Sequence, residues 1–95
     1  MLQKTPIDIK KVSELNIDRE LIRLGMIAEL DAVSLYEQLA AMTKDKLLKA
    51  VFLDIAKEEK THAGEFLTLL LKLDKEQEKE LQEGKEEVEE IEEEL

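Results

Sequence analysis

Apolar residues recur every three or four positions between residues 17 and 42, the period of one face of an α-helix. The central series of this segment is Ile22, Met26, Glu29, Val33, Tyr36 and Ala40. A second apolar row lies beside it, at Leu21, Leu24, Ala28, Ala32, Leu35, Leu39 and Met42. Together the two rows cover a broader arc than one partner helix buries. The pattern predicts a helix from about Ile17 to about Met42.

Residues 46–73 repeat this pattern and predict a second helix. Its central series is Leu48, Phe52, Ile55, Glu59, His62, Phe66, Leu69 and Leu73. A second apolar set broadens the same face, at Leu47, Val51, Ala56, Ala63, Leu67 and Leu70. In both segments, polar residues therefore interrupt an otherwise apolar series.

Residues suited to helix capping lie at the start of both segments. Asn16 or Asp18 is suited to cap the first helix, and Thr43 or Asp45 the second. Within the first helix only Gly25 is unfavourable, at a cost of about 1 kcal/mol. The link at 43–45 is too short for anything but an antiparallel helical hairpin.

The two ends of the chain differ from this hairpin. Residues 1–16 contain the only proline, Pro6, and show no sustained period, so we predict an irregular N-terminal arm. Residues 75–95 are rich in glutamate, and Gly84 interrupts a thin apolar series there. We predict an acidic, partly helical tail, with a third helix docked on the hairpin or on a neighbour as the alternative. The predicted units are thus an arm at 1–16, a hairpin at 17–74 and a tail at 75–95.

The composition narrows the possible partners. The chain has 95 residues, no cysteine and a net charge of −10, so disulfides and thiolate metal sites are excluded. Residues 76–95 hold eleven Glu and two Lys, a net of −9, which leaves the rest nearly neutral. This charge argues against nucleic acid and anionic membranes as partners. The absence of a long apolar run or signal-peptide pattern makes a cytoplasmic protein the expectation.

Three metal-binding side chains are expected at one height in the hairpin. The midpoint of residues 29 and 59 is residue 44, and that of residues 29 and 62 falls between 45 and 46. Folding at the predicted turn therefore brings Glu29, Glu59 and His62 together, roughly 22 Å from the turn. Carboxylates inside an apolar interface are costly unless they are paired or bind a metal.

This set of residues is half of a known kind of site. Di-iron carboxylate sites in four-helix bundles take one Glu from each of two helices and a Glu-x-x-His pair from each of the other two. Here one helix carries Glu29, and the other carries Glu59 and His62. Two chains related by a two-fold axis would complete the set. We therefore predict an all-α fold, an antiparallel two-helix hairpin that forms half of a four-helix bundle and is completed by dimerisation.

Other interpretations of these residues remain open. Eighteen glutamates make a Glu-x-x-His spacing weak evidence by itself, and a lone histidine on an apolar face is more often a hydrogen-bonded core residue. Glu58 competes with Glu59 as the ligand. Tyr36 is either core or a hydrogen-bond donor beside the metal ligands.

The residues E-L-D-A-V-S-L-Y-E-Q-L-A at 29–40 resemble the first ligand helix of ferritin-like proteins, and E-E-K-T-H-A at 58–63 resembles the second. Rubrerythrins and bacterioferritins carry this pair twice, whereas it occurs here once. A short chain with one copy resembles the encapsulated ferritins, over about residues 10–73.

The resemblance implies that Glu29, Glu59 and His62 are iron ligands, that Tyr36 lies beside the site and that Asp31 matches an acidic metal-entry position. Ala28 stands where a second entry acid is often found. The family also implies dimers assembled as a ring of five, a decamer without a storage cage. It implies a location inside an encapsulin nanocompartment, with the shell protein as partner. No shell-targeting peptide is recognisable, so fusion of the acidic tail to a shell is another route.

The leading hypothesis is a ferroxidase that oxidises Fe(II) with O2 or peroxide at a di-iron site between two chains. A non-redox metal-stapled dimer holding zinc or manganese is the first alternative. A metal-free helical interaction protein is the second. A rubrerythrin-like peroxide reductase is the third, and it would need an external electron donor because the chain has no cysteine.

Overall fold

Three helices make up the computed structural model, which describes Asp8 and residues 16–95. They are α1 (Ile17–Met42), α2 (Lys46–Leu73) and α3 (Lys75–Glu94), and none of the described residues forms a strand. The predicted all-α fold and the predicted bounds of the first two helices are confirmed. The expected N-terminal arm lies outside the described residues, apart from Asp8 and Asn16. The division into arm, hairpin and tail stays a prediction.

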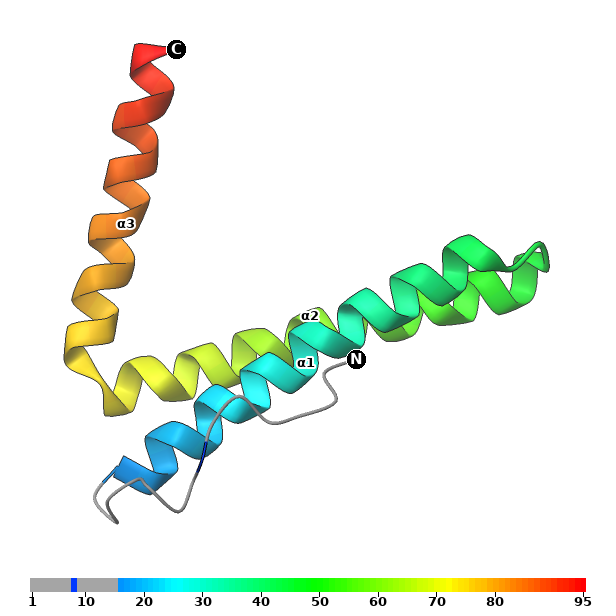
Figure 1. The fold of residues 1–95 in the computed structure, drawn as a ribbon, viewed down its shortest axis with the longest axis horizontal. Coiled ribbons are helices and arrows are strands. Elements are labelled where there is room, and N and C mark those ends of the chain that lie inside the picture. Colours follow the sequence, from blue (N-terminus) through cyan, green and yellow to red (C-terminus); the bar gives the residue numbers. More distant parts are fainter. Residues whose placement is uncertain (1–7, 9–15) are drawn as a thin grey trace.

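Capping residues define the turn between α1 and α2. The Asp45 carboxylate accepts a hydrogen bond of 2.8 Å from the Leu48 backbone N–H, so Asp45 is the cap of α2. The Thr43 hydroxyl instead accepts from the Asp45 backbone N–H, at 3.2 Å. At the other end of α1, Asn16 occupies the N-cap position without a side-chain capping bond. The tight turn makes α1 and α2 run side by side (Figure 1).

The interface between α1 and α2 contains small residues at its closest points. Among the described residues, the buried apolar side chains are Val33, Ala40, Ala56 and Leu70. A Cβ added to Gly25 of α1 would lie 2.8 Å from the ring of Phe66 of α2. Gly25 is therefore required for this close approach, which its cost to the helix alone does not reveal.

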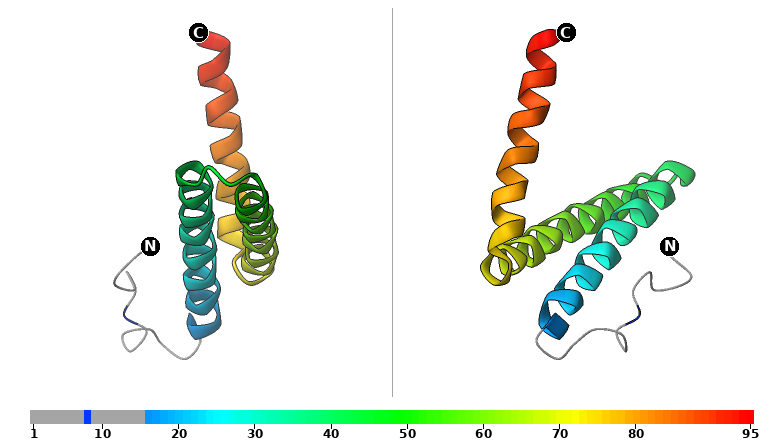
Figure 2. Two further views of the ribbon diagram at one scale, coloured as in Figure 1. Left: turned by 90° about the vertical axis from the view of Figure 1, so that its right-hand side faces the viewer. Right: turned by 60° about the vertical axis from the view of Figure 1, so that its left-hand side comes forward.

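The C-terminal segment is one continuous helix that passes through Gly84, whereas the sequence favoured a tail that is only partly helical, with a third helix as the alternative. Glu and Lys are good helix formers, and together with a strong cap they outweigh one glycine. The cap is Asp74, whose Oδ1 accepts a 3.0 Å bond from the Gln77 backbone N–H. Helix α3 leaves the hairpin steeply and is exposed along almost its whole length (Figures 1 and 2).

Large apolar side chains remain exposed on all three helices. They are Leu21, Leu30, Met42, Leu47, Leu48, Val51, Leu53, Leu69, Leu73, Leu81, Val88, Ile91 and Leu95. Where such side chains share one helix face, they form the kind of exposed apolar patch that marks interaction sites. None of the helices in the described part of the chain is both long and apolar enough to cross a membrane.

Candidate metal site

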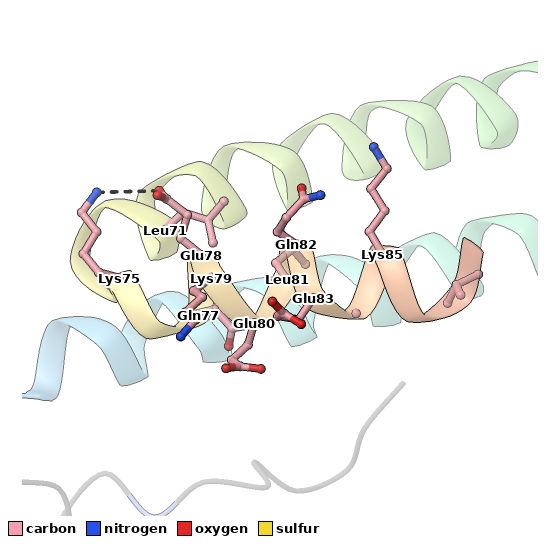
Figure 3. Close-up of a pocket in the computed structure, with 12 residues that line it drawn as sticks. Leu71, Lys75, Gln77, Glu78, Lys79, Glu80, Leu81, Gln82, Glu83 and Lys85 are labelled. Atoms are coloured by element: carbon pink, nitrogen blue, oxygen red, sulfur yellow. Dashed lines mark ion pairs between the residues drawn. The ribbon is translucent and has the colours of Figure 1, made fainter. Parts of the chain in front are cut away.

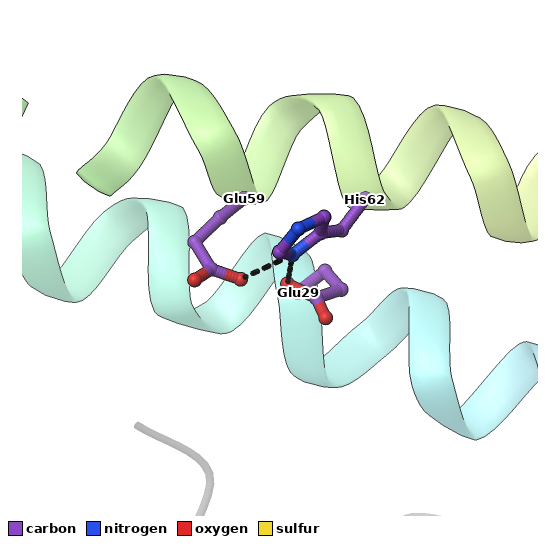
Figure 4. A group of neighbouring side chains, drawn as sticks. All are labelled: Glu29, Glu59 and His62. Carbon is purple, nitrogen blue, oxygen red and sulfur yellow. Dashed lines mark ion pairs between the residues drawn. The ribbon is translucent and has the colours of Figure 1, made fainter. Parts of the chain in front are cut away.

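Glu29, Glu59 and His62 converge at the middle of the hairpin (Figure 4). One ligand atom from each lies within 4.8 Å of the other two. Nδ1 of His62 is 3.4 Å from Oε2 of Glu29 and 3.4 Å from Oε2 of Glu59. The structure therefore brings together the three side chains that the sequence pattern selects.

The antiparallel hairpin explains this convergence. Glu59 and His62 are three residues apart on α2, so they share one helix face. The turn at 43–45 places Glu29 of α1 at the same height. Within the described residues the cluster forms with Glu59, whereas its neighbour Glu58 is exposed.

The two carboxylates are largely removed from water. The side chains of Glu29 and Glu59 are each 20% exposed, whereas that of His62 is 46% exposed. Oε2 of Glu29 is buried and has no hydrogen-bond partner among the described residues, because the His62 contact is an ion-pair distance without hydrogen-bond geometry. A buried carboxylate oxygen without a partner is costly. A cation bound beside it would remove that cost.

The donor set and its spacing fit a metal ion. Ligand atoms at about 2.1 Å from one ion lie roughly 3 Å apart when they are at right angles. The two separations of 3.4 Å between Nδ1 of His62 and the carboxylate oxygens are close to this value. Carboxylate oxygen and imidazole nitrogen suit divalent iron, manganese and zinc. Three side chains do not fill the coordination sphere of such an ion. Further ligands can reach it from the exposed side of His62.

On the α2 face that carries His62, Glu58 and Glu65 are exposed beside the imidazole, and exposed apolar side chains lie farther along the same face. Leu48 and Leu69 lie at multiples of seven residues from His62, and Val51 and Leu73 at eleven, so all four share its face. These four side chains are 44–56% exposed. The open side of the metal cluster therefore lies in a surface that has the character of an interface.

The structure places two further predicted residues near this region without assigning them roles. Tyr36 is half-buried, and its ring centroid lies 6.2 Å from that of Phe52, which is a packing contact. Asp31 is half-buried on α1. A hydrogen-bonding role for Tyr36 and an entry role for Asp31 stay predictions.

An ion pair that the apolar pattern does not predict joins the helices beside the cluster. Nζ of Lys60 is 3.2 Å from Oε2 of Glu37, and both side chains are about half exposed. No periodic signal indicates this pair, since both residues lie outside the apolar series. Exposed pairs of this kind contribute little to stability.

Comparisons with known proteins agree with one another. A family model described as EncFtn-like matches residues 6–87. The chain is 54% identical over 72 residues to a ferritin-like-encapsulin shell fusion protein of Pyrococcus furiosus, a match that covers 76% of this chain and 21% of that protein. It is 37% identical over 68 residues to the encapsulin nanocompartment cargo protein EncC of Myxococcus xanthus, covering 72% and 52%.

The structural comparison covers nearly the whole chain. The crystal structure of an encapsulated ferritin domain from Pyrococcus furiosus matches with a TM-score of 0.81 and 46% identity, over 96% of this chain and 93% of that one. In sequence, the chain spans about a fifth of the length of the shell fusion protein and about half of the cargo protein.

Proposed function

Since the chain belongs to the EncFtn-like family, as the resemblance of its sequence to encapsulated ferritins predicted, we propose that it is a ferroxidase. It oxidises Fe(II) to Fe(III) at a di-iron site formed between two copies of the chain. The observation that supports this most directly is the cluster of Glu29, Glu59 and His62, with one buried carboxylate oxygen that has no hydrogen-bond partner among the described residues.

Each side chain has a distinct role in this proposal. The Glu59 residues of two chains would bridge the two iron positions, as the resemblance to ferritin-like sites implies. Each iron would also be held by a Glu29 carboxylate and a His62 imidazole. The paired carboxylates favour the higher charge of Fe(III) over Fe(II), while the apolar surroundings strengthen that electrostatic preference. Two Fe(II) ions supply the two electrons that reduce O2 to peroxide, or peroxide to water.

Dimerisation completes the ligand set. One chain offers two carboxylates and one imidazole, and two chains offer the four Glu and two His of a ferritin-like di-iron centre. The exposed apolar residues around His62 provide the surface through which a second copy packs. Burying them excludes water from the ligands and removes a large apolar area from solvent.

The proposal extends to a compartment and a partner. One relative is a shell fusion protein and the other is a cargo protein of an encapsulin nanocompartment. We infer that this chain also works inside an encapsulin shell, where the Fe(III) product accumulates. Whether it is held there by fusion or as separate cargo follows from its genetic context.

The test is native mass spectrometry of the metal-free chain titrated with Fe(II) without oxygen, using wild type and two variants. Wild type should take up two irons per pair of chains, and Glu59→Gln should lose this uptake. Glu58→Gln is the matched control, because it removes one neighbouring carboxylate that is exposed and outside the cluster. Iron uptake by single chains, or equal loss in both variants, would contradict the shared site.

Admitting oxygen then separates a ferroxidase from a metal-stapled dimer. A ferroxidase loaded with two irons per dimer produces ferric absorbance much faster than Fe(II) in buffer. A dimer that only uses the metal to hold its chains together binds Fe(II), but the Fe(II) is then oxidised no faster than free Fe(II) in buffer. Loading Zn(II) first should block the fast phase, because zinc occupies the same ligands without redox chemistry.

A further inference from the structure

The aromatic residues of the chain are all placed within seven residues of a metal-cluster glutamate. The sequence contains one Tyr, two Phe and no Trp. Tyr36 follows Glu29 by seven residues. Phe52 and Phe66 come seven residues before and after Glu59. Seven residues make about two helical turns, so these rings lie on the helix faces that carry the ligands, on both sides of the cluster.

Phe66 occupies the layer next to the ligands and reaches across the interface between the helices. It follows His62 by four residues on α2, and Gly25 precedes Glu29 by four residues on α1. A Cβ on Gly25 would lie 2.8 Å from Cε1 and Cζ of Phe66 and 3.1 Å from Cε2, which form the far edge of the ring. The ring therefore points end-on at the bare backbone of α1. We term this contact the Gly25 notch.

The Gly25 notch and the metal ligands share one space between the helices. Helices α1 and α2 run in opposite directions, and a side chain in a helix leans toward the N-terminus of that helix. Glu29 therefore leans toward Gly25, and Phe66 leans toward His62. Oε2 of Glu29 is buried within a single chain, although the His62 side chain is 46% exposed. Side chains of the same hairpin that lean into this space are the ones placed to cover it.

The corner between α2 and α3 does not contribute to this space. Figure 3 shows an open groove at that corner, where Leu71, Leu81 and Val88 lie among lysines, glutamates and glutamines. None of the described aromatic residues and none of the three cluster residues lines this groove. The surroundings of the metal cluster are therefore set by α1 and α2.

We propose that Phe66, seated in the Gly25 notch, is a positioning residue for the metal site. The length of its ring fixes the distance between α1 and α2 one turn from the ligands, and thereby the distance between Glu29 and His62. The ring also covers the buried oxygen of Glu29 and excludes water, which strengthens the attraction of that carboxylate for a cation. This inference rests on the proposed function in requiring that the cluster binds metal, and it is independent of the reaction with oxygen.

Two substitutions disturb the Gly25 notch in opposite ways. Gly25→Ala overfills it, because the added methyl group meets the ring, and Phe66→Leu underfills it. Either one should weaken Co(II) binding to the metal-free, full-length chain about tenfold or more. The double variant should regain part of the affinity, because the smaller side chain leaves room for the methyl group. Such recovery would assign the loss to this contact and not to either residue alone.

The visible absorption of bound Co(II) gives a readout that a general loss of stability does not change. Co(II) absorbs less strongly as more ligands surround it, so water that enters the site lowers the absorbance. Phe66→Leu saturated with Co(II) should therefore absorb less per bound ion than wild type. Ala40→Gly is the matched control, because Ala40 is buried in the same interface but lies eleven residues from Glu29. This substitution weakens the helix and should keep both affinity and spectrum.

The outcomes separate this inference from the proposed function. All titrations are made at a temperature at which circular dichroism shows the variant to be folded, and if one single variant does not fold, the other makes the same test. Failure of wild type to bind Co(II), or equal binding by Glu59→Gln, would contradict the metal site itself. Binding by wild type with unchanged affinity and spectrum in Gly25→Ala and Phe66→Leu would overturn the role of Phe66 alone. An equal loss in Ala40→Gly would also overturn it, because the affinity would then follow stability.

Discussion

The ring of Phe66 on α2 lies against Gly25 on α1, so closely that a Cβ on Gly25 would be 2.8 Å from two of its atoms. Gly25→Ala should therefore destabilise the protein by about 1–3 kcal/mol through overpacking, although alanine favours the helix. Urea unfolding followed by circular dichroism measures the change.

Gly64→Ala is the matched control for this effect. Gly64 is also inside a helix, but a Cβ there meets nothing within 4 Å. The substitution should stabilise α2 by up to about 1 kcal/mol. Adding Phe66→Leu to Gly25→Ala should recover part of the loss, because the smaller side chain makes room. Similar changes in the free energy of unfolding for Gly25→Ala and Gly64→Ala would show that the Phe66 ring does not prevent a larger side chain at residue 25.

The two oxygens of Asp74 permit a separation of capping from ion pairing. Asp74→Asn keeps an acceptor for the Gln77 N–H and loses the charge opposite Arg23, so it should cost less than about 1 kcal/mol. Asp74→Ala loses both and should cost about 1–2 kcal/mol. The rate of amide hydrogen exchange in the first turn of α3 should rise only in Asp74→Ala. A rise in both variants would show that the negative charge of Asp74, and not its capping hydrogen bond, stabilises this turn.

Metal binding should stabilise the assembled protein. Zn(II) or Mn(II) at a free concentration one hundred times its Kd should add about 2.7 kcal/mol, because metal binds the folded chains and not the unfolded ones. Thermal melts should show an increase that EDTA reverses. His62→Ala should remove it. An increase that survives in His62→Ala would place the stabilising metal elsewhere, such as on the acidic α3.

Substitution of Tyr36 tests whether a side chain that does not bind the metal supports one of the metal ligands. Tyr36→Phe keeps the ring contact with Phe52 and removes only the hydroxyl, so stability should change by less than about 1 kcal/mol. If the hydroxyl supports a ligand, Fe(II) affinity or oxidation should fall about tenfold or more. Phe52→Leu is the complementary variant, since it weakens the ring contact and retains the hydroxyl. Normal iron oxidation in Tyr36→Phe would leave Tyr36 as a packing residue.

Most of the hairpin could be predicted from the amino-acid sequence. The helix bounds at Ile17, Met42, Lys46 and Leu73 agree with the predictions, because long periodic segments and short polar turns are strong local signals. The meeting of Glu29, Glu59 and His62 also followed from counting residues on both sides of the turn, since rise per residue is constant in a helix.

Other features depend on contacts between segments that no local pattern records. Gly84 interrupts the apolar series of the tail, which the sequence predicted to be only partly helical, yet α3 continues through it because Asp74 caps the helix and favourable residues surround the glycine. The link from Arg23 to Asp74 joins residues distant in sequence, and neither belongs to an apolar series. The pairing of Gly25 with Phe66 is likewise a matter of which side chain the neighbouring helix presents.

By itself, the sequence determined the helices, their antiparallel pairing and the height at which three metal-binding side chains meet, because these depend on periodicity and on turn length. The tertiary structure decided which oxygen of Glu29 is buried without a hydrogen-bond partner in the described chain, how far His62 is exposed and where α3 points. Those properties depend on the rotation of each helix about its axis and on the contacts of Asp74. Both are set by packing between segments, which a one-dimensional pattern does not contain.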